Sequence, residues 1–159
     1  MTAPTDTSAV PAVGTLAPDF TLASTSGQRV TLSALRGRPV LLAFFPAAFT
    51  SVCTTEVCAF SDDYAAFAQQ DLVVLPISVD LVPSLQEFKR KYELKVDLLS
   101  DARREASRAY GVLLERTYAA NRAYFLVDRE GIVRWAHVEE HGGFRRENAE
   151  ILAEVAKLG

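Results

Sequence analysis

Two cysteines five residues apart are the residues of this sequence best suited to chemistry. Both lie in the segment from Phe44 to Cys58, where an apolar run of strand length ends and a helical pattern begins. Sites form at such strand-to-helix junctions in open α/β sheets. If Thr50 is the N-cap, Cys53 takes the third helical position, among amides that have no partner within the helix. Those amides and the helix dipole favour a thiolate over a thiol, so this position suits a reactive cysteine, although a cysteine on an apolar stripe can also be a small buried hydrophobic residue.

The spacing of the two cysteines limits any bond between them. Five residues of an ideal helix correspond to about 500° of rotation and about 7.5 Å of rise, which places the two Cα atoms roughly 8.6 Å apart. Disulfides rarely span more than about 7 Å between Cα atoms. A bond between Cys53 and Cys58 therefore requires the helix start to unwind, and the β-branched Thr54 and Thr55 lower the cost of that step.

The elements that must position the cysteines alternate along the chain. Apolar runs at 40–45 and 72–79 are typical of strands buried on both faces, although Pro76 requires a bulge or a place where no backbone donor is needed. Between them, residues 51–70 predict one helix whose apolar stripe comprises Cys53, Val57, Phe60, Tyr64 and Phe67. Further predictions are helices near 83–92, 103–110 and 146–158, a hairpin at 123–136 with Gly131 in its turn, and an N-terminal hairpin over 18–33. This order predicts an α/β domain with a central mixed sheet and helices on both faces.

The composition limits the classes of function. The chain has 159 residues, 49% of them apolar, and a formal net charge of −3, so it can bury a core without a disulfide or a structural metal. A slightly acidic chain with no basic cluster argues against a nucleic-acid partner. We expect a tail over 1–12 and one domain over 13–159, with no membrane span and no secretion signal. The expected compartment is the cytoplasm, where disulfides are transient and catalytic.

The segment from Pro46 to Cys53 resembles the signature of the peroxiredoxin family. It matches the pattern Pro-x-x-x-Thr-x-x-Cys, and the similarity extends to 17–20, 77–80, 98–101 and 121–128. The resemblance implies a thioredoxin-like fold and a peroxidase that needs no cofactor, with Cys53 as the peroxidatic cysteine. It also implies that Thr50 hydrogen-bonds the peroxide and the sulfur, and that Arg122 is the donor to the oxygen on which charge develops. Pro46 then shields the pocket from water, and Glu56 belongs to the network that supports the arginine.

The second cysteine resembles the peroxiredoxin Q, or bacterioferritin-comigratory-protein, subgroup. That resemblance implies an atypical two-cysteine mechanism, in which Cys53 reduces hydrogen peroxide or an organic hydroperoxide and becomes a sulfenic acid. Cys58 then forms an intramolecular disulfide, which thioredoxin or a similar dithiol reduces. The flanking residues 44–50 and Glu56 are more similar to the one-cysteine alkyl hydroperoxide reductase E subgroup, for which an external thiol is the resolver. The expected assembly is a monomer or a weak homodimer.

Two other classes of function fit some of the same residues. Cys53, Cys58, His137 and His141 are the ligand types of a zinc site, but the wide gap between the cysteines and the histidines is unlike zinc-finger spacing. A thioredoxin-like dithiol oxidoreductase would share the fold, but that chemistry normally uses Cys-x-x-Cys. Metal analysis tests the first class, and insulin reduction compared with peroxide consumption tests the second.

Overall fold

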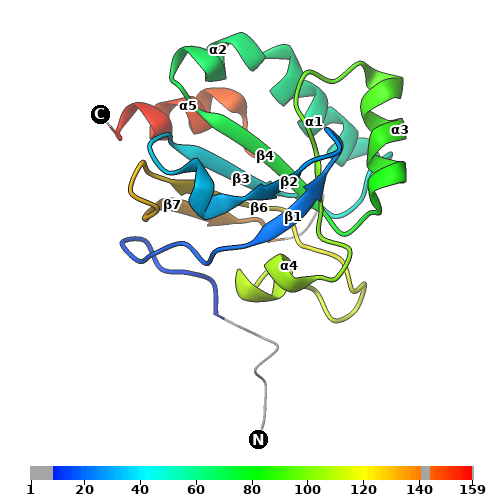
Figure 1. The fold of residues 1–159 in the computed structure, drawn as a ribbon, viewed down its shortest axis with the longest axis horizontal. Helices are drawn as coiled ribbons and strands as arrows, with labels where there is room; N and C mark the ends of the chain where they lie inside the picture. The colour runs from blue at the N-terminus through cyan, green and yellow to red at the C-terminus, as the bar shows by residue number, and fades with distance from the viewer. Residues whose placement is uncertain (1–8, 141–143, 159) are drawn as a thin grey trace, which may run out of the picture.

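A seven-stranded sheet crosses the middle of the molecule in the order β2-β1-β5-β4-β3-β6-β7 (Figure 1). The computed structural model describes residues 9–140 and 144–158, so most of the expected tail over 1–12 lies outside the described residues. The strands are β1 (Thr21–Ser24), β2 (Arg29–Thr31), β3 (Val40–Phe44), β4 (Val73–Ser78), β5 (Leu99–Ser100), β6 (Ala123–Val127) and β7 (Val133–Val138). Strand β4 is parallel to β3 and β5, and the other neighbours are antiparallel. The predicted mixed sheet and both predicted hairpins are confirmed.

Helices cover the sheet on both faces. They are α1 (Ser51–Asp62), α2 (Tyr64–Gln69), α3 (Val82–Tyr92), α4 (Glu105–Ala109) and α5 (Asn148–Ala156), with a 3-10 turn at Leu32–Leu35. Helices α1, α2 and α5 lie over one face and α4 lies over the other (Figure 1). No helix in the described part of the chain has the length and apolar character needed to span a bilayer.

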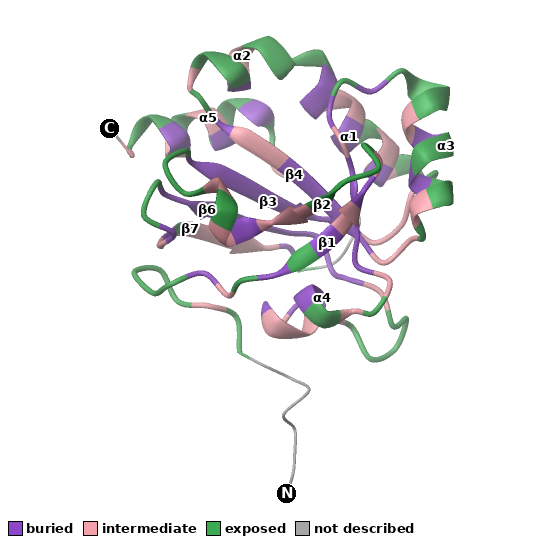
Figure 2. Ribbon diagram, viewed as in Figure 1, coloured by how far each residue is buried: buried purple, intermediate pink, exposed green. Residues whose placement is uncertain are grey.

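The central strands are apolar throughout because each face buries its own cluster. Alternate side chains of a strand point to opposite faces, so Leu42 and Phe44 of β3 join the cluster under α4, while Leu41 and Ala43 join the cluster under α1, α2 and α5. Figure 2 shows the result, with buried strands between helices whose outer faces are exposed. This double burial explains the continuous apolar run that predicted the strand.

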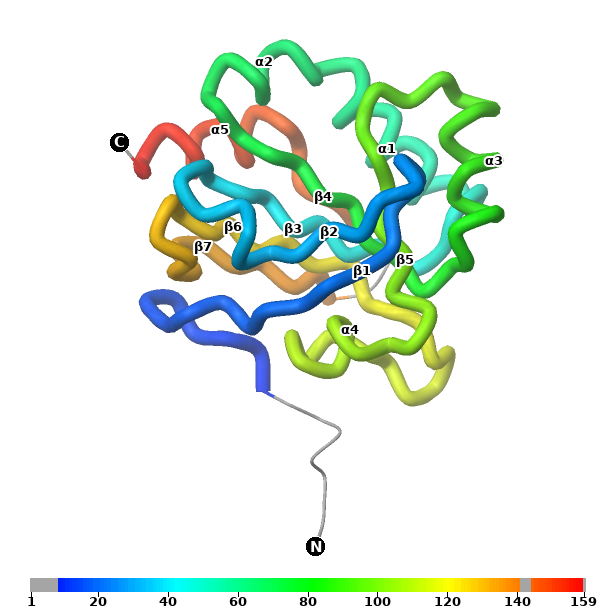
Figure 3. Tube along the Cα trace, viewed as in Figure 1, coloured from blue at the N-terminus to red at the C-terminus, as the bar shows by residue number. Residues whose placement is uncertain are grey.

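The segment before β1 is fastened to the β6–β7 hairpin. Gly14 N donates to the Val133 carbonyl at 2.8 Å, and Val133 N donates to the Thr15 carbonyl at 2.9 Å. Ala17 N also donates to the Gly131 carbonyl at 2.9 Å. Figure 3 traces this segment past the hairpin before it enters β1.

The single helix predicted over 51–70 is wrong, because the chain breaks it at Asp63. That residue has φ −98° and ψ 20° and separates α1 from α2. The side-chain amide of Asn148 donates to the Ala59 carbonyl at 2.9 Å and to Asp63 Oδ2 at 2.8 Å, which stabilises the break from another helix. Beyond the break the apolar stripe shifts, so Tyr64 is exposed while Phe67 remains buried.

Pro76 lies inside β4 without a bulge. It pairs with Ala43 in a regular parallel register with β3. Strand β5 pairs only with Ile77 and Ser78, so the ladder on the other side of β4 starts after the proline. The missing donor is therefore not needed, which confirms one of the two predicted arrangements. The two-residue β5 itself was too short to be predicted from its sequence.

Candidate active site

Cys53 lies where the sequence places it, at the start of the helix that follows a central strand. Thr50 is the N-cap of α1, with φ −83° and ψ 155°, and Cys53 is the third helical residue. Its side chain is 1% exposed. The Thr50 hydroxyl does not cap the helix, because it donates to the Ala47 carbonyl at 2.8 Å. No side-chain cap therefore competes with a sulfur anion for the amides at this helix start.

Arg122 reaches Cys53 from the beginning of β6. In the antiparallel register of β3 and β6, Phe44 pairs with Ala123, so Arg122 stands beside the end of β3. Its guanidinium is 1% exposed, and Nη2 donates to Cys53 Sγ at 2.9 Å. A buried cation in direct contact with the sulfur stabilises a thiolate and any negative charge that develops beside it.

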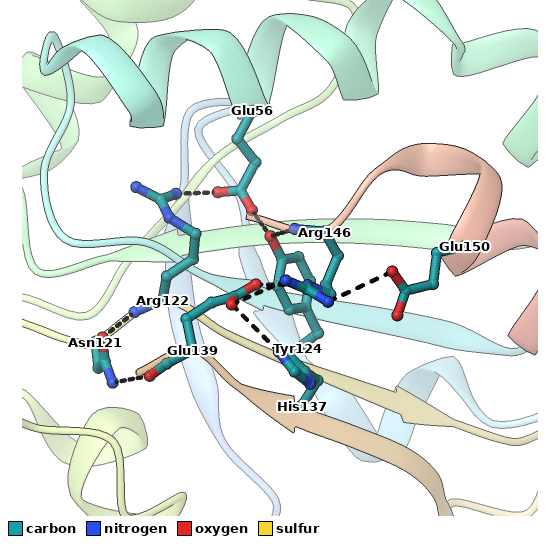
Figure 4. Close-up of polar contacts among 8 residues, drawn as sticks. All are labelled: Glu56, Asn121, Arg122, Tyr124, His137, Glu139, Arg146 and Glu150. Atoms are coloured by element: carbon teal, nitrogen blue, oxygen red, sulfur yellow. Dashed lines mark hydrogen bonds and ion pairs between the residues drawn. The ribbon is translucent and has the colours of Figure 1, made fainter. Parts of the chain in front are cut away.

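Glu56 holds the other arm of the guanidinium. It lies one turn after Cys53 on α1, and its Oε1 accepts a hydrogen bond from Arg122 Nη1 at 2.5 Å. Its Oε2 accepts a hydrogen bond from the Tyr124 hydroxyl (Figure 4). Burial raises the pKa of Glu56, although the Arg122 charge and the hydrogen bonds from Tyr124 and Arg122 oppose that rise. The carboxylate orients the guanidinium so that one nitrogen faces the sulfur.

A wider set of polar contacts fixes Arg122 at its backbone. Arg122 N donates to Asn121 Oδ1 at 2.9 Å, and Glu139 N donates to the Arg122 carbonyl at 3.0 Å. The Glu139 carboxylate accepts a hydrogen bond from Arg146 Nε at 2.8 Å (Figure 4). Sequence reasoning missed Tyr124, Glu139 and Arg146. Only Tyr124 had a signal, since it is two residues after Arg122 and so points to the same face of the strand.

The loop between β3 and α1 carries the remaining predicted site residues. Pro46 is half-buried and Thr50 is exposed in this loop. Asp80, at the end of β4, accepts hydrogen bonds from Ala48 N at 2.8 Å and from Ser78 Oγ at 2.7 Å. Asp80 therefore anchors the loop to the sheet at the carboxyl end of the strand.

Cys58 is half-buried on the second turn of α1. Both cysteines are free, and the helix that carries them is intact. Burial, and then the charge of Asp62, raise the pKa of the Cys58 thiol. Cys58 is thus a protonated thiol in this conformation, and a bond to Cys53 requires the unwinding that the spacing predicts.

The contacts of His137 differ from those of a metal ligand. It lies on β7, with Nε2 3.2 Å from Glu139 Oε1, and its ring stacks on Trp135. His141 lies outside the described residues. Among residues 9–140 and 144–158, no three His, Cys, Asp or Glu side chains gather as metal ligands do.

Known proteins are similar to this chain in sequence. The AhpC/TSA family model matches residues 13–136. The chain is 37% identical over 138 residues to the bcp peroxiredoxin of Coxiella burnetii, which covers 82% of this chain and 91% of that protein. It is 41% identical over 136 residues to alkyl hydroperoxide reductase E of Mycobacterium tuberculosis, which covers 84% of this chain and 89% of that protein.

A solved structure agrees with these matches. The crystal structure of the reduced 2-Cys peroxiredoxin of Plasmodium vivax superposes with a TM-score of 0.85 at 31% identity, over 91% of this chain and 80% of that chain. The fold is therefore thioredoxin-like, as the resemblance implied. The chain belongs to the AhpC/TSA family and is a peroxiredoxin, a thiol-dependent peroxidase.

Proposed function

We propose that Cys53 is the peroxidatic cysteine and that Arg122 is the donor that stabilises the leaving oxygen. The observation that carries this assignment is the contact of 2.9 Å between Arg122 Nη2 and Cys53 Sγ, in a place where both side chains are 1% exposed. A fixed cation that is shielded from water stabilises a developing charge far more strongly than a cation in water.

The first step forms a sulfur–oxygen bond and breaks the peroxide bond. The Cys53 thiolate attacks the terminal oxygen of hydrogen peroxide or an organic hydroperoxide and becomes a sulfenic acid. The other oxygen leaves with the electron pair, takes up a proton and departs as water or an alcohol. Arg122 and the amides at the start of α1 face the region where that charge develops. Thr50 turns its hydroxyl from Ala47 to the peroxide, and Pro46 keeps water from the sulfur.

The second step uses Cys58 once the start of α1 has unwound. Its thiolate attacks the sulfenic sulfur, a disulfide forms, and the sulfenic oxygen leaves as hydroxide that is protonated to water. Thioredoxin or a similar dithiol then reduces the disulfide by exchange, in a reducing compartment such as the cytoplasm. The raised pKa of Cys58 supports this order, because Cys58 in the folded helix holds its proton more tightly than an exposed thiol does.

Mass spectrometry after one equivalent of hydrogen peroxide tests both steps. The proposal expects the loss of two hydrogen atoms within a monomer, and no change in Cys53→Ser. The gain of one oxygen atom, as a sulfenic acid on Cys53 with Cys58 still a free thiol, would assign resolution to an external thiol. A doubled mass would assign it to a bridge between two chains. Oxidation that survives in Cys53→Ser would refute Cys53 as the nucleophile.

A further inference from the structure

The polar contacts around Arg122 close into a ring that returns to the same residue. From the Arg122 carbonyl the contacts pass to Glu139 N, and from the Glu139 carboxylate to the Arg146 guanidinium. The backbone amide of Arg146 donates to the Tyr124 hydroxyl at 2.9 Å. Tyr124 donates to Glu56, and Glu56 accepts from the Arg122 guanidinium (Figure 4). Tyr124 therefore connects helix α1, through Glu56, with the segment before α5, through Arg146.

The Tyr124 hydroxyl is fixed in direction by its two contacts. Burial, followed by the Glu56 charge, raises the pKa of Tyr124, so the phenol keeps its proton and is the donor to Glu56 Oε2. Its oxygen also accepts the hydrogen bond from Arg146 N, which occupies a lone pair and orients the O–H group. The ring of Tyr124 is fully buried on β6, so the whole side chain is held in place.

Glu56 depends on this donor because its two oxygens have different partners. Oε1 is held by Arg122 and Oε2 by Tyr124. A buried carboxylate that loses a hydrogen bond either takes up a proton or turns toward another donor. Either change withdraws the charge that keeps the Arg122 guanidinium aimed at Cys53 Sγ.

We propose that Tyr124 is a positioning residue that keeps Glu56 ionised and in register with Arg122, and so keeps the guanidinium on the sulfur of Cys53. This role rests on the proposed function of Cys53 and Arg122. The titratable and charged groups that act on Glu56 are Arg122, directly before β6, Tyr124 on β6, and Arg145 in the segment before α5.

Replacing the hydroxyl alone tests the proposal. The variant Tyr124→Phe keeps the ring and removes the donor, and Tyr110→Phe is a matched control. Tyr110 is also fully buried and donates to a single acceptor, the Pro18 carbonyl at 2.6 Å, but it lies on the opposite face of the sheet. The measurement is the second-order rate constant for oxidation of Cys53 by hydrogen peroxide from pH 5 to pH 9, with the free energy of unfolding measured in urea.

Tyr124→Phe should lower the rate constant by about tenfold near pH 6 and by less near pH 8. The reason is that losing one hydrogen bond to a carboxylate raises its pKa, so Glu56 stays protonated to a higher pH and the acidic limb of the profile moves upward. Tyr110→Phe should lower stability without moving either the rate constant or the profile. A wild-type profile in Tyr124→Phe, or an equal displacement in Tyr110→Phe, would overturn the proposal.

Glu56→Gln provides the second test, because glutamine cannot titrate. The acidic limb assigned to Glu56 should be absent in Glu56→Gln, and adding Tyr124→Phe to it should change the rate constant by less than about twofold. Persistence of the limb, or an unchanged tenfold effect of Tyr124→Phe in that background, would refute the role. Failure of the underlying function looks different, since peroxide consumption would then survive in Cys53→Ser.

Discussion

Replacing Arg122 with lysine separates the effect of its positive charge from the effect of its two hydrogen bonds to different partners. The guanidinium places one nitrogen 2.9 Å from Cys53 Sγ and another 2.5 Å from Glu56 Oε1. A lysine keeps the positive charge beside Glu56 but offers a single ammonium, which cannot reproduce two parallel arms. An uncharged substitute would be less informative, because an unpaired buried carboxylate costs about 3–5 kcal/mol of stability.

The expected loss of rate follows from the contact distance. Two unit charges 2.9 Å apart interact by about 6 kcal/mol at an effective dielectric constant of about 20. Only the part that grows between the ground state and the transition state accelerates the reaction. Removal of one well-placed donor to a developing anion costs about 10²–10³ in rate. We therefore expect Arg122→Lys to oxidise about 10²-fold more slowly, which corresponds to about 2.7 kcal/mol of the barrier.

The assay is rapid mixing with hydrogen peroxide, acid quenching and mass spectrometry of Cys53, in a Cys58→Ser background that reports the first step alone. Arg38→Lys is the matched control, since Arg38 is an exposed arginine in an ion pair with Asp71. The control should oxidise at the parent rate. A rate constant for Arg122→Lys within about threefold of the parent would refute the proposal that the Arg122 guanidinium stabilises the leaving oxygen.

Three further substitutions test other parts of the structure. Burial and then the charge of Asp62 raise the pKa of Cys58 in the folded protein, so Asp62→Asn should lower that pKa. In the reduced Cys53→Ser background, alkylation of Cys58 at pH 7 should become about twofold to threefold faster, with no difference at a pH where the thiol is fully ionised in both proteins. Mass spectrometry that finds an unchanged alkylation rate at pH 7 would contradict this prediction. Asp80→Ala should release the Ala48 amide and slow Cys53 oxidation about tenfold, and the idea fails if rapid mixing finds the parent rate. Burial alone would raise the pKa of Asp128, but hydrogen bonds in the β6–β7 turn hold that pKa below its usual value. The stability that this carboxylate contributes is therefore present at neutral pH and is lost as the pH falls through the lowered pKa. Asp128→Ala should thus cost about 2 kcal/mol in urea unfolding at pH 7 and less at pH 3, and an equal cost at both values would contradict this reasoning.

The site was predictable as far as local patterns reach. The strand before the loop, Thr50 as N-cap and Cys53 as third helical residue were all predicted, because caps and apolar periods depend on residues close together in the chain. The pairing of Arg122 with Cys53 was assigned from the family resemblance. No periodicity or spacing indicated it.

Errors arose where distant segments meet. The helix predicted over 51–70 breaks at Asp63, where Asn148 from α5 supplies hydrogen bonds that residues 51–70 alone do not predict. Strand β5 exists because Leu99 and Ser100 lie between two partners in the sheet, and two residues carry no period of their own.

Local patterns in the sequence placed the proposed nucleophile at a helix start and predicted that this helix must unwind before Cys58 can reach it. What surrounds the sulfur depends instead on how distant segments pack. The β3–β6 register brings Arg122 to Cys53, and the shared face of β6 brings Tyr124 to Glu56 on α1. The physical reason is that helix position follows from neighbours within a few residues, whereas the contacts of a buried charge depend on the register of strands far apart in the chain.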